Sequence, residues 1–367
     1  MRLTCTQENF SKGLNIVSRL SDKSINLPIL NNVLVQAKKE GIILTVTNLE
    51  VGIRTKVRGK IEEEGDFTVQ ARLLTDFVNT LKKENISVYL DDKNLNIKGE
   101  NHQTIIRGMD ATDFPVVPGV DKAYSFTIIS SKIKEALSQV LFAVSHDDSR
   151  PELNGVFVKV EDTECTLAAT DSYRLAEKKI QISQKSKEKS VIIPAKTIHE
   201  VLRILDLQEA QEVTIAINDS QILFSIGETE IISRIINGEY PDYTQIIPQS
   251  FKNKVIFDTG EMVSAIKTTS LFCKQGINDV RISLDKRFTD IAVNAENSTF
   301  GKNVSNVPSK NKNQEMDIVF NYKFFLDGVL HGSGDTSVLK TNDATSPALL
   351  VDKDDESFIY IIMPIKQ

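Results

Sequence analysis

The sequence predicts an α+β fold made of three similar domains. A five-residue motif occurs three times, as ILNNV at residues 29–33, ELNGV at 152–156 and GINDV at 276–280, with asparagine in the third place each time. The three asparagines are 123 and then 124 residues apart. This period is longer than that of solenoid repeats, and each third of the chain is long enough to form a small domain with its own core.

Each third also repeats one order of elements, which is the second observation behind the predicted fold. Apolar residues at helical spacing precede each motif, and strand patterns that alternate apolar and polar residues follow it. A second helix pattern and further hairpins come later in each third. The expected helices are residues 7–20, 71–83, 130–145, 195–207, 260–275 and 321–330. Helices that pack one stripe against an antiparallel sheet are typical of the α+β class.

Proline-containing segments mark the junctions between the thirds. The first is DFPVVP at residues 113–118, and the second is EYPDYTQIIP at residues 239–248. Proline ends regular structure because it lacks a backbone N–H group and has a fixed φ angle. We therefore expect domains at residues 1–120, 121–249 and 250–367.

Composition narrows the class of protein. The chain has 367 residues, of which 40% are hydrophobic and 26% charged, as in ordinary globular proteins of two or three domains. Its cysteines, Cys5, Cys165 and Cys273, are far apart and form no CxxC pair. That pattern argues against a disulfide framework or a zinc site and favours a reducing compartment. The sequence shows no signal-peptide pattern and no apolar run of membrane-spanning length, so we expect a cytoplasmic protein.

Charge is distributed unevenly along the chain. The formal net charge is −6, whereas tight binders of nucleic-acid phosphates are usually basic. The six expected helices nevertheless contain 12 lysines and arginines against 7 aspartates and glutamates. If these helices share one side of the protein, that side is positive. Ordinary solvated helix faces explain the same count about equally well.

The sequence offers no clear catalytic or metal-binding set. The segment SHDDS at residues 145–149 is better interpreted as a polar loop than as a metal cluster, and HGSGD at 331–335 has a lone GxG, typical of a helix end. Within ATDSYR at 169–174, strand alternation would place Asp171 and Arg174 on opposite faces, so no acid–base pair is expected there. The four histidines are His102, His146, His199 and His331, and none belongs to an HExxH motif. These absences favour a non-enzyme without a cofactor or metal.

Several longer motifs carry a resemblance to a known family. In chain order they are LPILNNVLV, DFP, RPELNGVF, LAATDSYRLA, NGEYPDYTQIIP, FNYKFFLD and YIIMPIK. Together they resemble the bacterial DNA polymerase III beta subunits, the DNA sliding clamps, over nearly the whole chain. The resemblance implies three clamp domains per chain and a head-to-tail homodimer that closes a ring of six domains around double-stranded DNA. In that ring helices line the hole, antiparallel sheets form the outer surface, and no cofactor or catalytic residue is needed.

The resemblance also implies partners and their sites. The partners are duplex DNA without sequence preference, the DNA polymerase III alpha subunit, the clamp loader, and other polymerases and repair proteins that carry linear peptide motifs. The implied peptide-groove residues are Leu153, Thr170, Ser172, Tyr173, Arg174, Leu175, Pro241, Ile246, Ile277, Asn321, Phe324, Pro347, Ile362, Met363, Pro364 and Ile365. The implied DNA-facing residues are Arg19, Lys82, Lys83, Lys132, Lys134, Lys196, Arg203, Lys267 and Lys323. The implied dimer contacts are Leu73, Leu271 and Phe272.

Four departures from the family pattern bear on these sites. Tyr173 replaces a frequent histidine, Gln245 a frequent arginine, and Lys366-Gln367 a frequent basic–apolar ending, so peptide preference is expected to differ from that of relatives. Asp147 stands where a DNA-touching glutamine is common, which weakens the expectation of a DNA contact in that loop.

Two rival interpretations remain open from the sequence. One is a monomeric three-domain adaptor that uses the same groove and never encircles DNA. The other is a hydrolase whose site would assemble from His146, Asp147, Asp148 and Asp171.

Overall fold

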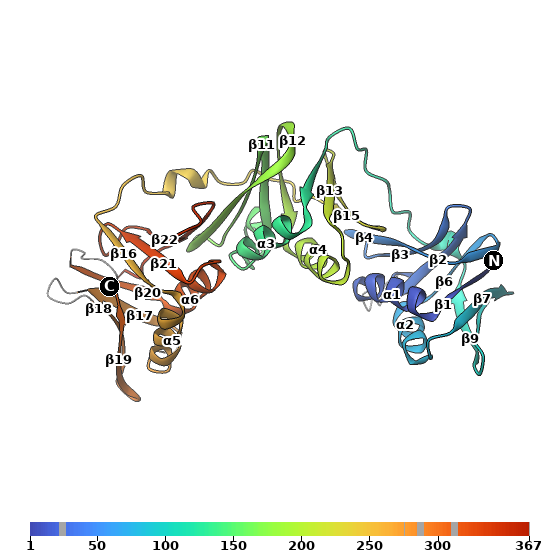
Figure 1. The fold of residues 1–367 in the computed structure, drawn as a ribbon, viewed down its shortest axis with the longest axis horizontal. Coiled ribbons are helices and arrows are strands. Elements are labelled where there is room, and N and C mark those ends of the chain that lie inside the picture. The colour runs from blue at the N-terminus through green and yellow to red at the C-terminus, as the bar shows by residue number, and fades with distance from the viewer. Residues whose placement is uncertain (22–26, 275, 285–289, 310–314, 367) are drawn as a thin grey trace. The chain divides into compact units, whose positions relative to one another are not determined.

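A computed structural model describes residues 1–21, 27–274, 276–284, 290–309 and 315–366. Gln275 at the end of an expected helix, the expected strand residues 285–289 and the terminal Gln367 lie outside the described residues. The chain forms two compact units. The first comprises Met1–Ser130 with His199–Ile235, and the second comprises Ser131–Ile198 with Ile236–Gln367. Figure 1 shows the helices and strands of each unit.

The helices agree with the six that the sequence predicts. They are α1 (Gln7–Val17), α2 (Ala71–Thr80), α3 (Ser130–Leu141), α4 (Ala195–Leu207), α5 (Thr259–Ser270) and α6 (Tyr322–His331). Polar side chains cap three of them, because an N-cap oxygen can accept an otherwise unpaired backbone N–H group of the first turn. Thr6 caps α1, Asp258 caps α5 and Asn321 caps α6.

The first unit is built on one antiparallel sheet. Within the described residues its order is β10-β13-β14-β15-β4-β3-β2-β6-β9-β8-β7-β1-β5. Its strands are β1 (Arg2–Thr6), β2 (Asn32–Lys38), β3 (Gly41–Thr47), β4 (Val51–Val57), β5 (Lys60–Glu63), β6 (Gly65–Gln70), β7 (Asn85–Asp91), β8 (Asn94–Lys98), β9 (Gln103–Met109), β10 (Ser125–Ile129), β13 (Glu212–Ile217), β14 (Gln221–Ile226) and β15 (Thr229–Arg234). Helices α1 and α2 lie against each other, and α1 packs on β3 and β4 (Figure 1). Gly13 makes that packing possible, since a Cβ atom there would stand 2.4 Å from the Val57 side chain.

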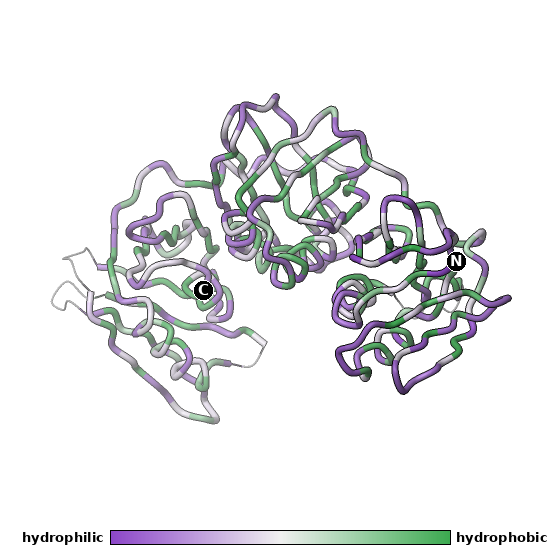
Figure 2. The backbone as a smooth tube through the Cα atoms, turned by 45° about the vertical axis from the view of Figure 1, so that its right-hand side comes forward, coloured by the Kyte–Doolittle hydropathy of each residue, from purple (hydrophilic) through white to green (hydrophobic). Residues whose placement is uncertain are grey.

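The second unit contains two antiparallel sheets in the part of the chain that the structure describes. Their orders are β11-β12-β23-β22-β21-β16 and β19-β18-β17-β20. The strands are β11 (Gly155–Thr170), β12 (Arg174–Pro194), β16 (Asn253–Asp258), β17 (Asp279–Leu284), β18 (Asp290–Asn297), β19 (Gly301–Pro308), β20 (Met316–Asn321), β21 (Thr336–Thr341), β22 (Ala348–Asp352) and β23 (Phe358–Ile362). Figure 2 shows hydrophobic residues within the strands and helices and hydrophilic ones along many of the loops.

The sheets continue across the expected domain limits. In the first unit β15 pairs with β4, and Ile231 stands opposite Ile53. In the second unit β12 pairs with β23, and Arg174 stands opposite Ile362. Each sheet therefore joins strands from two neighbouring thirds of the sequence, so the thirds are units of repetition while the sheets are continuous hydrogen-bonded bodies.

The repeated five-residue motif joins a strand to a helix. The carbonyl of Asn154 accepts the N–H of Ala195, the first residue of α4, at 3.2 Å. The carbonyl of Asn278 accepts the N–H of Tyr322, the first residue of α6, at 2.8 Å. Because the first N–H groups of a helix have no partner inside the helix, this bond satisfies one of them and fixes where the helix starts.

Candidate functional site

The tight turn between β11 and β12 carries two of the implied groove residues, Ser172 and Tyr173. Ser172 has a φ angle of 77°, a left-handed conformation that few residues other than glycine adopt. The Thr170 hydroxyl accepts the N–H of Ser172 at 3.1 Å and donates to the carbonyl of Arg174 at 2.6 Å. One Asp171 carboxylate oxygen accepts the N–H groups of Tyr173 and Arg174 at 2.9 and 3.0 Å. These bonds hold the turn in one conformation.

Arg174 is held by three groups from different segments. Its Nε donates to Asp171 at 2.9 Å, its Nη2 to the carbonyl of Phe142 at 2.8 Å, and its Nη1 to Asp327 of α6. The expectation that Asp171 and Arg174 point to opposite faces is wrong, because residues 171–173 form a turn in which strand alternation does not apply. Burial opposes the charged form of Arg174, but neighbours led by Tyr360 and Asp171 outweigh it and the pKa is raised.

Aromatic rings surround this arginine. Its guanidinium carbon lies 4.5 Å from the ring centre of Phe324 and 5.5 Å from that of Phe142. The ring of Tyr173 stacks on Phe324 with centroids 6.5 Å apart. Tyr173 is 65% exposed, so the turn and α6 together present an aromatic surface to solvent.

The C-terminal tail contacts both sheets of the second unit. Strand β23 ends at Ile362, and the tail follows it. The N–H of Met363 donates to the carbonyl of Tyr173 at 2.9 Å, and the N–H of Ile365 donates to the carbonyl of Val319 in β20 at 2.7 Å. Met363 therefore lies beside the turn, with its side chain half-buried.

The implied groove residues differ in accessibility. Ser172, Tyr173, Ile246 and Ile277 are exposed, whereas Arg174, Pro241, Asn321, Phe324, Pro347, Met363 and Ile365 are half-buried and Leu153, Thr170, Leu175, Ile362 and Pro364 are buried. Leu153 and Leu175 belong to a core cluster with Tyr243. Side chains such as Leu175 and Ile362 are fully buried in this conformation, and their place among the groove walls stays a prediction.

Sequence reasoning missed three residues that build the site. Phe142 and Asp327 hold Arg174, and Arg150 donates to the Ser172 hydroxyl at 3.0 Å. None of the three gave a local signal in the sequence. Asp327 lies in a different third of the chain from Arg174, and Phe142 lies 32 residues before it.

The implied DNA-facing residues are mostly exposed. Those exposed are Arg19, Lys82, Lys83, Lys132, Lys134, Lys196, Lys267 and Lys323. Lys83 pairs with Glu8 at 2.6 Å, and this hydrogen bond and ion pair raise the pKa of Lys83. Arg203 differs from the other eight, because its side chain is largely buried. It donates to Glu200 and to the carbonyls of Asn15 and Ile16, which commits its guanidinium to the protein itself.

The implied dimer contacts lie at the surface. Leu73 on α2 is 50% exposed, and Leu271 just after α5 is 73% exposed, so Leu271 does not serve the core. Phe272 is half-buried. Each unit also has a strand with an incompletely paired side. Strand β9, with exposed Ile105, pairs with β6 only at its C-terminal end, and β19, with exposed Val304, is the last strand of its sheet.

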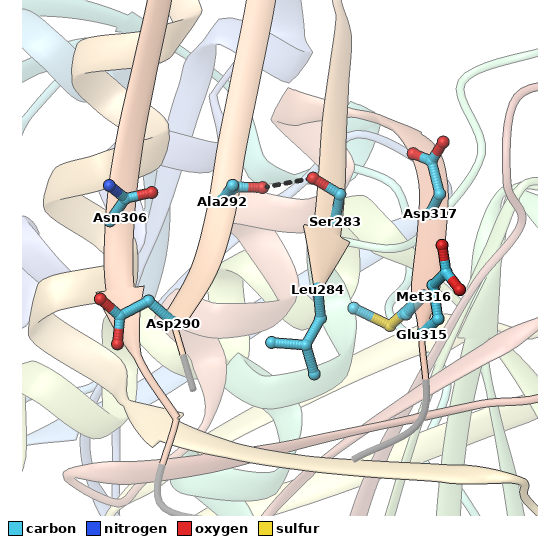
Figure 3. Close-up of a pocket in the computed structure, with 8 residues that line it drawn as sticks. All are labelled: Ser283, Leu284, Asp290, Ala292, Asn306, Glu315, Met316 and Asp317. Atoms are coloured by element: carbon cyan, nitrogen blue, oxygen red, sulfur yellow. Dashed lines mark hydrogen bonds between the residues drawn. The ribbon is translucent and has the colours of Figure 1, made fainter. Parts of the chain in front are cut away.

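A separate hollow of about 450 Å³ lies on the four-stranded sheet (Figure 3). Its lining includes the carboxyl groups of Asp290, Glu315 and Asp317, and Arg281 donates to Asp317 at 2.7 Å. It contains none of the implied site residues. Among the described residues, no group of three or more His, Cys, Asp or Glu side chains is placed to hold a metal ion.

The residues of the hydrolase interpretation do not form a catalytic set. The backbone N–H and the hydroxyl of Ser149 lower the pKa of Asp147 in an exposed loop. The carboxylate of Asp171 is occupied by hydrogen bonds from the turn and from Arg174.

No helix in the described part of the chain has the length and apolar character needed to cross a membrane.

Comparison with known proteins gives a consistent result over the full chain. Models of the DNA polymerase III beta subunit match as the N-terminal domain at residues 1–118, the central domain at 127–242 and the C-terminal domain at 244–366. The beta sliding clamps of Synechocystis sp. and Bacillus subtilis are each 28% identical, over 100% of this chain and 99% and 100% of theirs.

Solved structures agree with the sequence matches. The DNA polymerase III subunit beta of Pseudomonas aeruginosa matches with a TM-score of 0.95 and 26% identity, over 100% of both chains. The DNA polymerase sliding clamp of Bacillus subtilis matches with a TM-score of 0.95 and 27% identity, over 100% of this chain and 99% of that one. The chain therefore belongs to the family of DNA polymerase III beta subunits.

Proposed function

We propose that two copies of this chain close head to tail into a ring that encircles duplex DNA and tethers the replicative polymerase. The observation that carries the proposal is the match to all three clamp domains, in order and over the whole chain. A sliding clamp is a processivity factor without catalytic activity, and it needs no cofactor.

Exposed apolar residues and incompletely paired strands support the head-to-tail dimer. A ring of two identical chains, each joining its first domain to the third domain of the other, needs two unlike surfaces that complement each other. Leu73 and the open part of β9 offer one such surface, and Leu271 and β19 offer the other. An exposed strand edge binds another strand readily, because its N–H and C=O groups have no partners.

The exposed lysines support sliding on DNA. Phosphate contacts carry no sequence information, so a positive lining attracts any duplex. Water-bridged contacts let the backbone move without breaking a fixed bond. Eight of the nine implied basic residues are exposed and can act in this way, whereas the guanidinium of Arg203 is bonded to Glu200 and to backbone carbonyls of the protein itself. The negative charge of the rest of the chain disfavours side-on binding to DNA.

The surface around Tyr173 supports a groove for linear peptides. Exposed apolar and aromatic side chains with a flexible methionine are suited to leucine or phenylalanine anchors of a short peptide. Peptides of the polymerase alpha subunit, the clamp loader, other polymerases and repair proteins are the proposed occupants, in the cytoplasm. The Gln245 side-chain amide donates a hydrogen bond to Asp242 at 2.8 Å. Where relatives often have a charged arginine, this chain therefore has a neutral side chain that is hydrogen-bonded within the protein.

Retention on circular DNA tests the proposal. The chain is loaded onto nicked circular duplex by its clamp loader, and protein on DNA is separated from free protein by gel filtration. We expect it to stay on the circle and to leave after a restriction enzyme makes the DNA linear. Equal loss from circular and linear DNA would contradict encirclement. A native mass equal to one chain at micromolar concentration would favour the monomeric adaptor.

A further inference from the structure

Arg174 connects two surfaces of the groove that come from distant parts of the sequence. On one side is the turn that carries Tyr173, and on the other is α6, which carries Phe324 and Asp327. The guanidinium donates to Asp171 in the turn and to Asp327 in the helix at the same time. This connection is the arginine clasp, made of Arg174, Asp171, Asp327 and the Phe142 carbonyl.

The clasp leaves little of Arg174 for a ligand. Its side chain is only 12% exposed, and its three nitrogens each have a protein partner. The rings of Phe142 and Phe324 lie close to the guanidinium. A peptide that bound this group directly would have to displace a carboxylate from a charge-assisted hydrogen bond, which is among the stronger contacts in a protein.

The clasp also fixes what surrounds it. The carbonyl of Tyr173 accepts a hydrogen bond from the N–H of Met363. The carbonyl of Phe324 accepts one from the Tyr360 hydroxyl at 2.9 Å. Tyr360 packs where Gly328 has no side chain, since a Cβ atom there would stand 2.3 Å from its ring. The turn, the helix and the tail are thus held in one arrangement around a single guanidinium.

We infer that Arg174 is a positioning residue: it sets the spacing between Tyr173 and Phe324 and does not itself bind the peptide. This inference rests on the proposed groove function. Lysine cannot take over the role, because an ammonium group lacks the planar fork that reaches two carboxylates in fixed directions.

The test uses Arg174→Lys and Asp327→Ala, with Arg281→Lys as the matched control. Arg281 pairs with Asp317 in the same unit and is not part of the clasp. Affinity is measured by fluorescence anisotropy with a QLxLF-like peptide and with the same peptide carrying alanine in place of glutamine. Both clasp variants should weaken both peptides by a similar factor of about ten, as expected for one charge-assisted hydrogen bond. The control should change either affinity by less than about twofold.

Amide hydrogen exchange gives a readout that needs no peptide. We expect the Met363 amide to exchange about ten times faster in both clasp variants, because its acceptor on Tyr173 is no longer held in place, while Ile361 within β23 keeps its rate. Asp327→Ala keeps the test valid if Arg174→Lys fails to fold, since Asp327 is partly exposed and alanine favours helix.

Two results would overturn the inference. A loss confined to the glutamine-containing peptide would mean that Arg174 contacts the ligand. Unchanged affinity and unchanged Met363 exchange would mean that the clasp positions nothing. If the unaltered protein binds neither peptide, the proposed groove function fails, and Met363 exchange still decides whether Arg174 holds the turn.

Discussion

Side chains at the turn between β11 and β12 have several partners each, whereas most of the basic helix residues extend into solvent. Arg174 contacts Asp171, Asp327 and Phe142 with one guanidinium. Lys132 and Lys267, by contrast, are exposed on α3 and α5. A peptide is recognised by shape, which requires walls at fixed distances. The DNA backbone is recognised by charge, which tolerates mobile side chains.

This contrast predicts two kinds of mutational behaviour. Changes in the groove should be large and non-additive, because its residues share partners. Changes on the helix faces should be small, nearly additive and dependent on salt. The following variants test the contrast in order of expected effect.

Removing residues 363–367 should have the largest effect. The deletion removes the N–H groups that bond to Tyr173 and Val319, and with them one side of the proposed groove. We expect the affinity for a QLxLF-like peptide to fall by about a hundredfold or more, while the dimer stays intact. Anisotropy and native mass spectrometry measure the two properties. Deleting only Lys366 and Gln367 is the control, and unchanged binding by the longer deletion would place the groove elsewhere.

Leu271→Ala combined with Phe272→Ala should weaken the dimer next most strongly. Truncating an apolar residue at an interface centre often costs about 1 kcal/mol, so the double variant should lose about 2 kcal/mol and the dissociation constant should rise about thirtyfold. Sedimentation velocity across a dilution series gives that constant. Leu330→Ala, at a leucine that is 50% exposed on α6, is the matched control. A folded dimer that persists at nanomolar concentration would exclude these residues from the interface.

Tyr173→Ala should have an intermediate effect on peptide binding only. Its ring stacks on Phe324, and such an aromatic pair contributes about 1 kcal/mol beyond area burial. If the exposed ring makes a contact of similar size with an apolar anchor of the peptide, peptide affinity should fall by roughly fivefold. Tyr89→Ala, which removes the ring under Arg2 in the first unit, should leave peptide affinity unchanged. Tighter binding by Tyr173→Ala would show that the tyrosine obstructs the groove.

Charge reversal at Lys82 and Lys83, just after α2, should have the smallest effect per residue. Lys82→Glu with Lys83→Glu removes two exposed cations, and Glu8 also loses its ion-pair partner Lys83. Retention on circular DNA should fall, and its dependence on salt should become weaker, because fewer phosphates are neutralised. Lys60→Glu with Lys93→Glu makes the same charge change at exposed sheet and turn positions. Equal loss from both pairs would point to net charge alone.

Local patterns in the sequence were enough to predict the helices. Apolar spacing gave α1 to α6 within a few residues of their ends. The repeated motif predicted three similar domains, and in two of its copies the asparagine carbonyl accepts the N–H group that starts α4 or α6.

Local sequence patterns could not predict contacts between segments that are far apart in the chain. Arg203 looked like any basic residue on a helix face, and only the fold brings the Asn15 and Ile16 carbonyls to it. Asp327 likewise meets Arg174 only because α6 packs near the turn. The continuity of the sheets, as in the pairing of β15 with β4, also leaves no local trace.

The pairing of β15 with β4 has a consequence for how the chain is made. Ile53 and its partner Ile231 are 178 residues apart. While a ribosome adds those residues, the edge of β4 (Val51–Val57) has no neighbour on that side, and an open strand edge is a site of misassociation. Such a distant pairing also forms slowly, because the entropy cost of closing a long loop comes before any stabilising contact is made. A fragment of residues 1–120 should therefore aggregate under conditions in which the full chain folds. During synthesis, β4 is the strand whose open edge most needs protection from other chains.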